Sequence, residues 1–107
     1  MSKLLIIDDE KSVRTTLREI LEYESYIVDE AKDGEEGLRL ISKKTYNLII
    51  CDVKMPKLNG IELLEKANEL GSTCPFIMIS AHGTIETAME ATKKGAFDLI
   101  QKPPDLN

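Results

Sequence analysis

The amino-acid sequence predicts an α/β fold in which a five-stranded parallel sheet is doubly wound, with helices on both of its faces. The first observation is that short apolar runs, rich in β-branched residues, alternate with segments whose apolar residues have helical spacing. The second is that runs such as NLII, at residues 47–50, have consecutive apolar residues, so both faces of such a strand should be buried. The third is the length of 107 residues, which suffices for one domain with one hydrophobic core.

Five apolar runs are expected to form the strands of this sheet. Each is short, as strands of globular proteins usually are, and a segment with helical spacing separates it from the next. The predicted strands are Leu4–Ile7, Tyr26–Ala31, Asn47–Cys51, Phe76–Ile79 and Phe97–Ile100. Units of strand, helix and strand favour parallel pairs joined by right-handed crossovers.

Four segments between the strands are expected to form helices, each with one apolar face. In chain order these faces are Val13, Leu17, Ile20 and Leu21; Leu38 and Ile41; Ile61, Leu64 and Ala67; and Ile85, Ala88, Met89 and Thr92. Asp33 and Glu36 fit a capping box at the start of the second helix. Gly71 and Gly95 lie where the third and fourth helices should end.

A fifth helix is expected to follow the segment LIQKPPDLN, with Asp105 as its N-cap, but the sequence ends at Asn107. One face of the predicted sheet is then short of cover. We interpret residues 1–107 as a single domain, the N-terminal part of a longer protein, with its fifth helix truncated or absent. Cover supplied by another chain is the alternative.

Charge and cysteine content restrict the partners of this domain. The sequence has 14 basic and 19 acidic residues and a formal net charge of −5, and its lysines are scattered, which argues against direct nucleic-acid binding. Cys51 and Cys74 lack the spacing of metal ligands and are expected to be reduced thiols of a cytoplasmic protein. The apolar runs are too short for a signal peptide or a membrane span.

Five polar residues lie at the carboxyl ends of the predicted strands, where open α/β sheets bind their ligands. Asp8 and Asp9 follow the first strand, Asp52 the third, Ser80 the fourth and Lys102 the fifth. In the flavodoxin-like strand order 2-1-3-4-5 the first and third strands are neighbours, so the three carboxylates should lie close together. Asp9 alone could simply cap the first helix, but the set of five favours a functional site.

The residue types in this set suit phosphoryl transfer. Clustered carboxylates repel one another, and their hard oxygen atoms suit Mg²⁺. A carboxylate can also act as a nucleophile and form an acyl phosphate. Lys102 would neutralise charge on the phosphoryl oxygens, and Ser80 would donate a hydrogen bond to them. His82, expected in the loop before the fourth helix, is given no part in this chemistry.

The segments LLIIDDE, LIICDVKMPKLNGIELL, IMISAHG and GAFDLIQKP resemble the receiver domain of two-component response regulators over essentially the whole chain. The resemblance implies that Asp52 is the phosphoacceptor, which takes a phosphoryl group from the phosphohistidine of a sensor histidine kinase. It implies that Asp9 binds Mg²⁺ directly and that Asp8 acts largely through water. Asp52 and the backbone carbonyl of Lys54 are implied to be further protein ligands of the metal.

The same resemblance assigns the remaining motif residues. Ser80 is implied to be the hydroxyl that turns toward the phosphoryl group, and Lys102 the lysine that pairs with it. The bond from Lys102 to Pro103 is typically cis in such domains. Pro56 and Gly60 match the family's loop after the acceptor strand. Beyond its own phosphorylation and dephosphorylation, a domain of this kind is not expected to be an enzyme.

Two further features of the resemblance concern the output of the domain. Receivers often have an aromatic switch residue three positions before the lysine, but here that position is Leu99, and Phe97 cannot simply be assumed to replace it. The segment from residue 81 to the end is similar to receivers of sigma-54-dependent, nitrogen-regulation-type transcription activators. An ATPase domain and a DNA-binding domain follow the receiver in such proteins, and many receivers dimerise through a surface that includes the fifth helix.

Three alternatives remain at this level. The chain could be a stand-alone receiver in a phosphorelay. It could be a phosphohydrolase with an aspartate nucleophile, of the haloacid-dehalogenase class, but such enzymes usually have a second aspartate where this chain has Lys54. It could also be a receiver-like scaffold, against which the intact set of acidic residues, serine and lysine argues.

Overall fold

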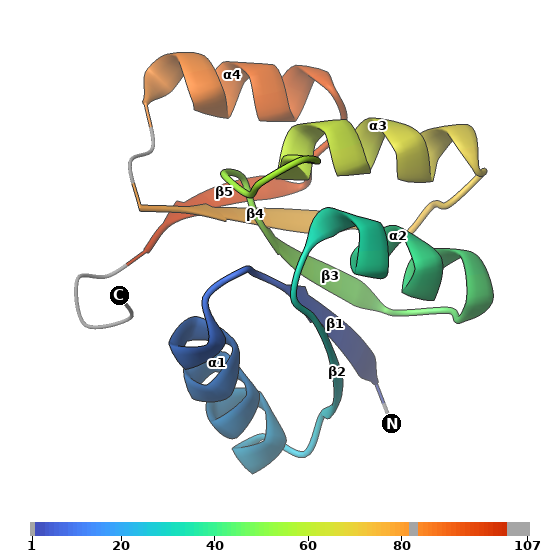
Figure 1. The fold of residues 1–107 in the computed structure, drawn as a ribbon, viewed down its shortest axis with the longest axis vertical. Helices are drawn as coiled ribbons and strands as arrows, with labels where there is room; N and C mark the ends of the chain where they lie inside the picture. Colours follow the sequence, from blue (N-terminus) through green and yellow to red (C-terminus); the bar gives the residue numbers. More distant parts are fainter. Residues whose placement is uncertain (1, 82–83, 103–107) are drawn as a thin grey trace.

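The structure, a computed structural model, describes residues 2–81 and 84–102, which contain five strands and four helices (Figure 1). The strands are β1 (Lys3–Ile7), β2 (Ile27–Ala31), β3 (Leu48–Asp52), β4 (Phe76–Ser80) and β5 (Asp98–Gln101). The helices are α1 (Lys11–Tyr23), α2 (Gly34–Lys43), α3 (Gly60–Glu69) and α4 (Ile85–Lys93). Each predicted strand agrees with the observed one to within one residue at either end. The predictions for His82, the bond to Pro103, Asp105 and a fifth helix lie outside the described residues.

The strands form one parallel sheet in the order β2-β1-β3-β4-β5, as predicted. Strand β1 lies between β2 and β3 and is parallel to both, so the carboxyl ends of these three strands are neighbours. Ile7, the last residue of β1, is in register with Ala31 on β2 and Cys51 on β3. The next residues along the two strands, Asp8 and Asp52, therefore lie side by side at this end of the sheet.

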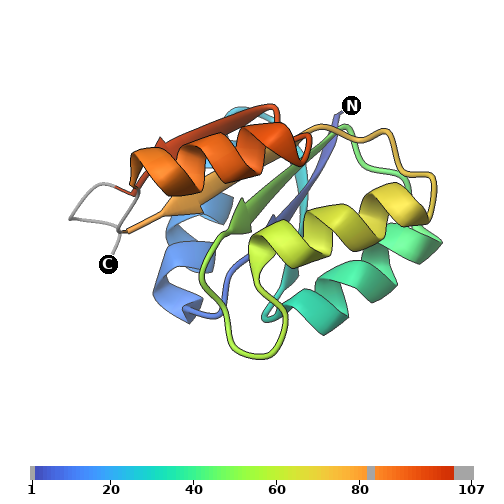
Figure 2. The same ribbon diagram turned by 90° about the horizontal axis from the view of Figure 1, so that it is seen from above.

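Helices cover both faces of the sheet, which confirms the doubly wound arrangement. Helix α1 lies on one face, and α2, α3 and α4 lie on the other (Figures 1 and 2). The main core fills the space between the sheet and the second group of helices, and the predicted face of the third helix is buried in it. This core includes Leu5, Ile7, Ile49, Cys51, Phe76 and Met78 from the strands and Ile61, Leu64 and Ala67 from α3.

The face that carries α1 is less completely covered within the described residues. Leu99 on β5 packs against the main core, so its neighbour Ile100 points to the opposite face, where its side chain is 49% exposed. On α1 itself Val13 is fully buried, but Ile20 is 54% exposed, which makes the buried stripe of this helix narrower than predicted. No helix in the described part of the chain is long and apolar enough to cross a membrane.

The predicted apolar face of the fourth helix is wrong in part: Ala88 is half-buried as expected, Met89 and Thr92 are not buried, and the side chain of Ile85 lies outside the described residues. Among the described side chains of α4, Ala91 is the fully buried one, whereas Met89 is 67% exposed and Thr92 is also exposed. Met89 lies two positions from Ala91, about 200° around the helix, so the two side chains cannot face the same surface. Helix α4 thus rests on the core through a small side chain, and apolar periodicity alone placed the buried face too far toward Met89 and Thr92.

The helix ends agree with the predictions in part. Asp33 caps α2 by accepting a hydrogen bond from the Glu36 N–H at 2.8 Å, but the Glu36 carboxylate accepts from the Lys32 N–H, so the predicted capping box is incomplete. The complete capping box is at α3, between Asn59 and Glu62. The predicted C-terminal glycines are confirmed. Gly71 follows the C-cap of α3, Gly95 follows the C-cap of α4, and each has a positive φ angle.

Candidate functional site

The loop after β1 carries three consecutive carboxylates. Asp8 is completely buried, its N–H donates to the Ala31 carbonyl at 3.1 Å, and its Oδ1 accepts from the Glu10 N–H at 2.8 Å. Asp9 and Glu10 are exposed beside it. Glu10 is the N-cap of α1 and makes no side-chain capping bond, so Asp9 does not cap this helix. The alternative explanation for Asp9 is therefore wrong.

The same loop has the donor set of a hard cation site. One ligand oxygen from each of Asp8, Asp9 and Glu10 lies within 4.8 Å of the others. Asp8 Oδ2 is buried, and its partner among the described residues is the ammonium group of Lys102. Oxygen ligands of this kind fit Mg²⁺. Glu10 belongs to this group although it was not a predicted ligand, and the acidic run at residues 8–10 was the signal for it.

Lys102 joins the ends of three strands. Its Nζ lies 3.0 Å from Asp8 Oδ2, 3.3 Å from Asp52 Oδ2 and 3.6 Å from Glu10 Oε1. The contact with Asp8 is an ion pair, whereas that with Asp52 is also a hydrogen bond. Lys102 is only 5% exposed, and its backbone N–H donates a hydrogen bond to the Ser80 carbonyl at 2.8 Å. The predicted convergence of strand ends is therefore present in the structure.

These residues open into a pocket of about 550 Å³ at the carboxyl end of the sheet. Its lining comprises Glu10, Asp52, Val53, Lys54, Asn59, Ser80, Ala81, Thr87 and Lys102. The Lys54 N–H reaches Asp52 Oδ1 at 3.4 Å, which orients the carboxylate. Asn59 and Thr87 were missed by the sequence analysis. Asn59 precedes Glu62 by three residues, a capping signal that also marks the start of a helix at the pocket.

Gly60 allows α3 to begin directly against the end of β3. A Cβ atom at this position would lie 2.3 Å from the Asp52 carbonyl oxygen. Its N–H donates to the Val53 carbonyl at 2.8 Å, so the two backbones are hydrogen-bonded at this crossing. No side chain fits here without displacing the backbone of Asp52. The match of Gly60 to the family motif thus has a steric reason.

The comparison with known families identifies the family of the chain. The family model of the response regulator receiver domain matches residues 4–107. The chain belongs to this family.

Two related proteins illustrate the match of this receiver. The transcriptional regulatory protein ZraR of Escherichia coli strain K12 is 34% identical over 104 residues, which cover 97% of the chain and 24% of that protein. The nitrogen assimilation regulatory protein NtrX of Azorhizobium caulinodans is 40% identical over 102 residues, which cover 94% of the chain and 22% of that protein. The receiver thus spans about a quarter of the length of the curated relatives that it matches.

A solved structure shows the same fold. A response regulator protein from Burkholderia pseudomallei, determined with a phosphorylated aspartic acid, calcium ion and citrate, superimposes on this receiver with a TM-score of 0.90. The two sequences are 26% identical, and the match covers 99% of this chain and 62% of the other.

Burial and charge together set the protonation of the receiver's site. Burial, with the nearby charge of Asp8, raises the pKa of Asp52 to about 6. Burial likewise raises the pKa of Asp8. Burial lowers the pKa of Lys102, but the hydrogen bonds and charges of the two carboxylates outweigh it, so this pKa lies above its usual value. Lys102 is therefore cationic at neutral pH, and Asp52 is mostly ionised.

The position of the family's aromatic switch has a different environment here. Leu99 is half-buried against the core, next to Met78 in the sheet register. Phe97 precedes β5, and its side chain is 76% exposed. The two residues therefore do not share one environment, and Phe97 does not substitute for a buried aromatic side chain.

Proposed function

We propose that this receiver is a phosphorylation switch in which Asp52 accepts a phosphoryl group from the phosphohistidine of a sensor histidine kinase. One observation carries the proposal. The buried Asp52 carboxylate lies 3.3 Å from the Lys102 ammonium group, and both residues line a pocket together with Ser80. The related Burkholderia protein, whose structure contains a phosphorylated aspartic acid, supports it.

The reaction requires an ionised carboxylate that can approach phosphorus. A carboxylate oxygen of Asp52 forms the new P–O bond, the P–N bond to the kinase imidazole breaks, and its electron pair returns to the imidazole nitrogen. The product is an acyl phosphate. Because the pKa of Asp52 is about 6, most molecules hold the nucleophilic form at neutral pH. Lys102 and the Ser80 hydroxyl would then pair with the phosphoryl oxygens.

The loop after β1, here called the acidic loop (residues 8–10), has side chains that fit a divalent cation. Asp8 and Asp9, together with Asp52 and the backbone carbonyl of Lys54, would hold Mg²⁺, and Glu10 is close enough to contribute. The close approach of one carboxylate oxygen from each of the three consecutive residues Asp8, Asp9 and Glu10, within 4.8 Å of one another, is the observation that supports this fit. When bound, Mg²⁺ supplies positive charge to the phosphoryl oxygens.

We infer further that the switch controls transcription. The relatives named as a transcriptional regulatory protein and a nitrogen assimilation regulatory protein support this inference. Each of them is about four times as long as the segment that matches this chain. On this proposal residues 1–107 are one domain of a longer cytoplasmic regulator, with a sigma-54-type ATPase domain and a DNA-binding domain as its output and a homodimer as one of its states. Membership of a phosphorelay as a stand-alone receiver is the alternative.

Phosphorylation by a small donor tests the central step. The chain, shown to be folded by circular dichroism, is incubated with acetyl phosphate with and without Mg²⁺, and its intact mass is measured. We expect one phosphoryl adduct that requires Mg²⁺. Asp52→Asn should abolish the adduct, whereas Asp98→Asn, at an exposed aspartate on β5, should retain it. A folded chain that forms no adduct, or an adduct that persists in Asp52→Asn, contradicts the proposal.

A further inference from the structure

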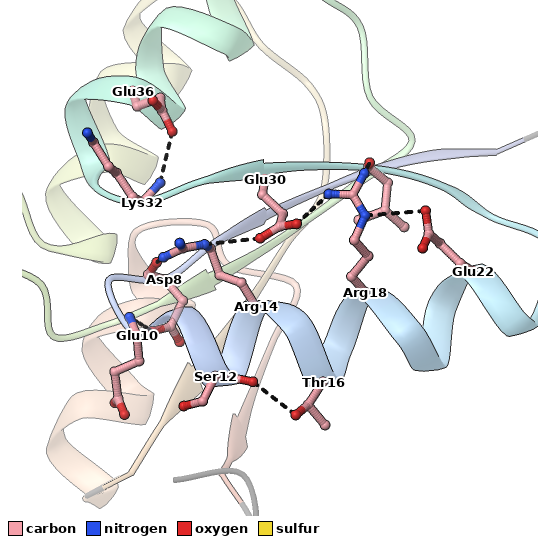
Figure 3. Close-up of polar contacts among 11 residues, drawn as sticks. Asp8, Glu10, Ser12, Arg14, Thr16, Arg18, Glu22, Glu30, Lys32 and Glu36 are labelled. Carbon is pink, nitrogen blue, oxygen red and sulfur yellow. Dashed lines mark hydrogen bonds and ion pairs between the residues drawn. The ribbon is translucent and has the colours of Figure 1, made fainter.

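Two arginines of α1, one turn apart, make parallel contacts with β2 (Figure 3). Arg14 Nε lies 3.1 Å from Glu30 Oε1, and Arg18 Nη1 contacts the other oxygen of the same carboxylate. Each arginine also donates to one backbone carbonyl. Arg18 Nη2 donates to the Val28 carbonyl at 2.7 Å, and Arg14 Nη1 donates to the Asp8 carbonyl at 2.8 Å.

The two backbone contacts differ in what they hold. Val28 lies within β2, where the sheet already orders the backbone. Asp8 is the first residue after β1 and begins the acidic loop, residues 8–10. The Arg14 side chain is only 14% exposed, so its hydrogen bonds are largely protected from competition with water. Arg14 is thus the side chain that anchors the acidic loop to the rigid pair formed by α1 and β2.

The contact of Arg14 fixes the direction in which the loop leaves the sheet. The Asp8 N–H is bound to the Ala31 carbonyl, and the Asp8 carbonyl is bound to Arg14, so both backbone polar groups of this residue are held. Because a peptide group is planar, holding the Asp8 carbonyl also orients the N–H and Cα of Asp9. The side chain of Asp9 starts from that Cα.

We propose that Arg14 is a positioning residue for divalent cation binding, which it supports through the Asp8 carbonyl without touching the cation. The inference rests on the proposed function, in which the acidic loop holds Mg²⁺. Groups that hold metal ligands in place without contacting the metal commonly change the metal affinity by about 10- to 100-fold when they are removed. The network of Glu30 and Arg18 behind Arg14 restricts the guanidinium group to this orientation.

The pair of arginines provides its own control. Arg14→Gln and Arg18→Gln both remove a contact with Glu30 and a bond to a backbone carbonyl, but only Arg14→Gln releases Asp8. Binding of Mg²⁺ to the 107-residue chain is measured by isothermal titration calorimetry, and urea unfolding is measured alongside. We expect Arg14→Gln to raise the Mg²⁺ Kd about tenfold and Arg18→Gln to change it less than about twofold, although both variants unfold more easily.

Each outcome has a distinct meaning. An unchanged Kd in Arg14→Gln, or an equal rise in both variants, overturns the positioning role and leaves the proposed function intact. Wild-type chain that binds no Mg²⁺ overturns both proposals. If Arg14→Gln does not fold, Arg14→Lys replaces it. This variant keeps the charge but not the planar pair of donors, and it should still weaken Mg²⁺ binding more than Arg18→Lys does.

Discussion

Lys102 Nζ lies 3.0 Å from Asp8 Oδ2 at the carboxyl end of the sheet, and both side chains are almost completely buried. A buried ammonium group is tolerated here because two buried carboxylates face it, those of Asp8 and Asp52. The lysine is therefore the internal counterion of the acidic site. Its removal should affect folding as well as chemistry.

Lys102→Met is expected to destabilise the Mg²⁺-free protein strongly. The variant leaves two buried carboxylates without their cation, and breaking a buried pair in this way costs about 3–5 kcal/mol. Mg²⁺ should recover part of the loss, because a divalent cation restores positive charge beside Asp8. The measurement is urea unfolding at neutral pH, in EDTA and in Mg²⁺.

Lys94→Met is the matched control for this substitution. Lys94 also pairs with a carboxylate, that of Glu65 at 3.1 Å, but both side chains are 42% exposed. The loss of such a surface pair should cost less than about 1 kcal/mol and should not depend on Mg²⁺. Similar losses in the two lysine variants would show that the buried pairing of Lys102 contributes nothing special.

The charge of Asp52 should make the metal-free protein less stable as the pH rises. The pKa of Asp52 is about 6 in the folded protein against 3.8 for an unperturbed aspartate. A raised carboxyl pKa favours the protonated form in the folded state. The stability that it contributes is fully present below about pH 4 and is lost as the pH rises through 6, by roughly 2–3 kcal/mol.

Asp52→Asn removes this titration and tests the sign. The unfolding free energy of the variant and of the wild type is measured in EDTA by urea unfolding at each pH. The value for the variant minus that for the wild type should increase as the pH is raised from about 5 to about 8. Asp98→Asn, at an exposed position on β5, is the control for the loss of a carboxylate outside the site. A gain for Asp52→Asn that shrinks with rising pH contradicts the assigned pKa.

Gly60→Ala should impair both folding and phosphorylation. The new methyl group would meet the Asp52 carbonyl at 2.3 Å, so the acceptor backbone or the start of α3 must move, at about 1–3 kcal/mol or more. Gly71→Ala is the control, because Gly71 has a φ of 85° but nothing within 4 Å of an added Cβ. It should cost about 1 kcal/mol through backbone strain and leave the rate of phosphorylation by acetyl phosphate unchanged.

Asn59→Ala should cost about 1 kcal/mol in unfolding free energy. The variant loses the hydrogen bond from the Glu62 N–H to the Asn59 side chain, which caps α3 beside the pocket. Asn59→Asp keeps an oxygen acceptor there and should retain most of the stability. Thermal unfolding of both variants decides the point, and an equal loss in the two would exclude the cap as the cause.

The sequence by itself determined the strands, their order and the residues at their carboxyl ends. Consecutive apolar residues such as Ile49 and Ile50 are compatible with a strand buried on both faces and with little else of that length. Once the strand order is known, the parallel register brings Asp8 beside Asp52 without further information. The motif residues could be predicted because their positions follow from the sheet alone.

Tertiary structure alone decided which sides of the helices are buried and what supports the acidic loop. On α4, Ala91 rather than Met89 faces the protein core. Which side chain contacts the core depends on how the helix is rotated about its axis, and its apolar period does not determine that rotation. The contact from Arg14 to the Asp8 carbonyl joins a side chain to a backbone atom, and carbonyl groups are the same at every position of a sequence. Such a contact exists only when the helix and the loop are packed together, so no pattern of residues in the sequence predicts it.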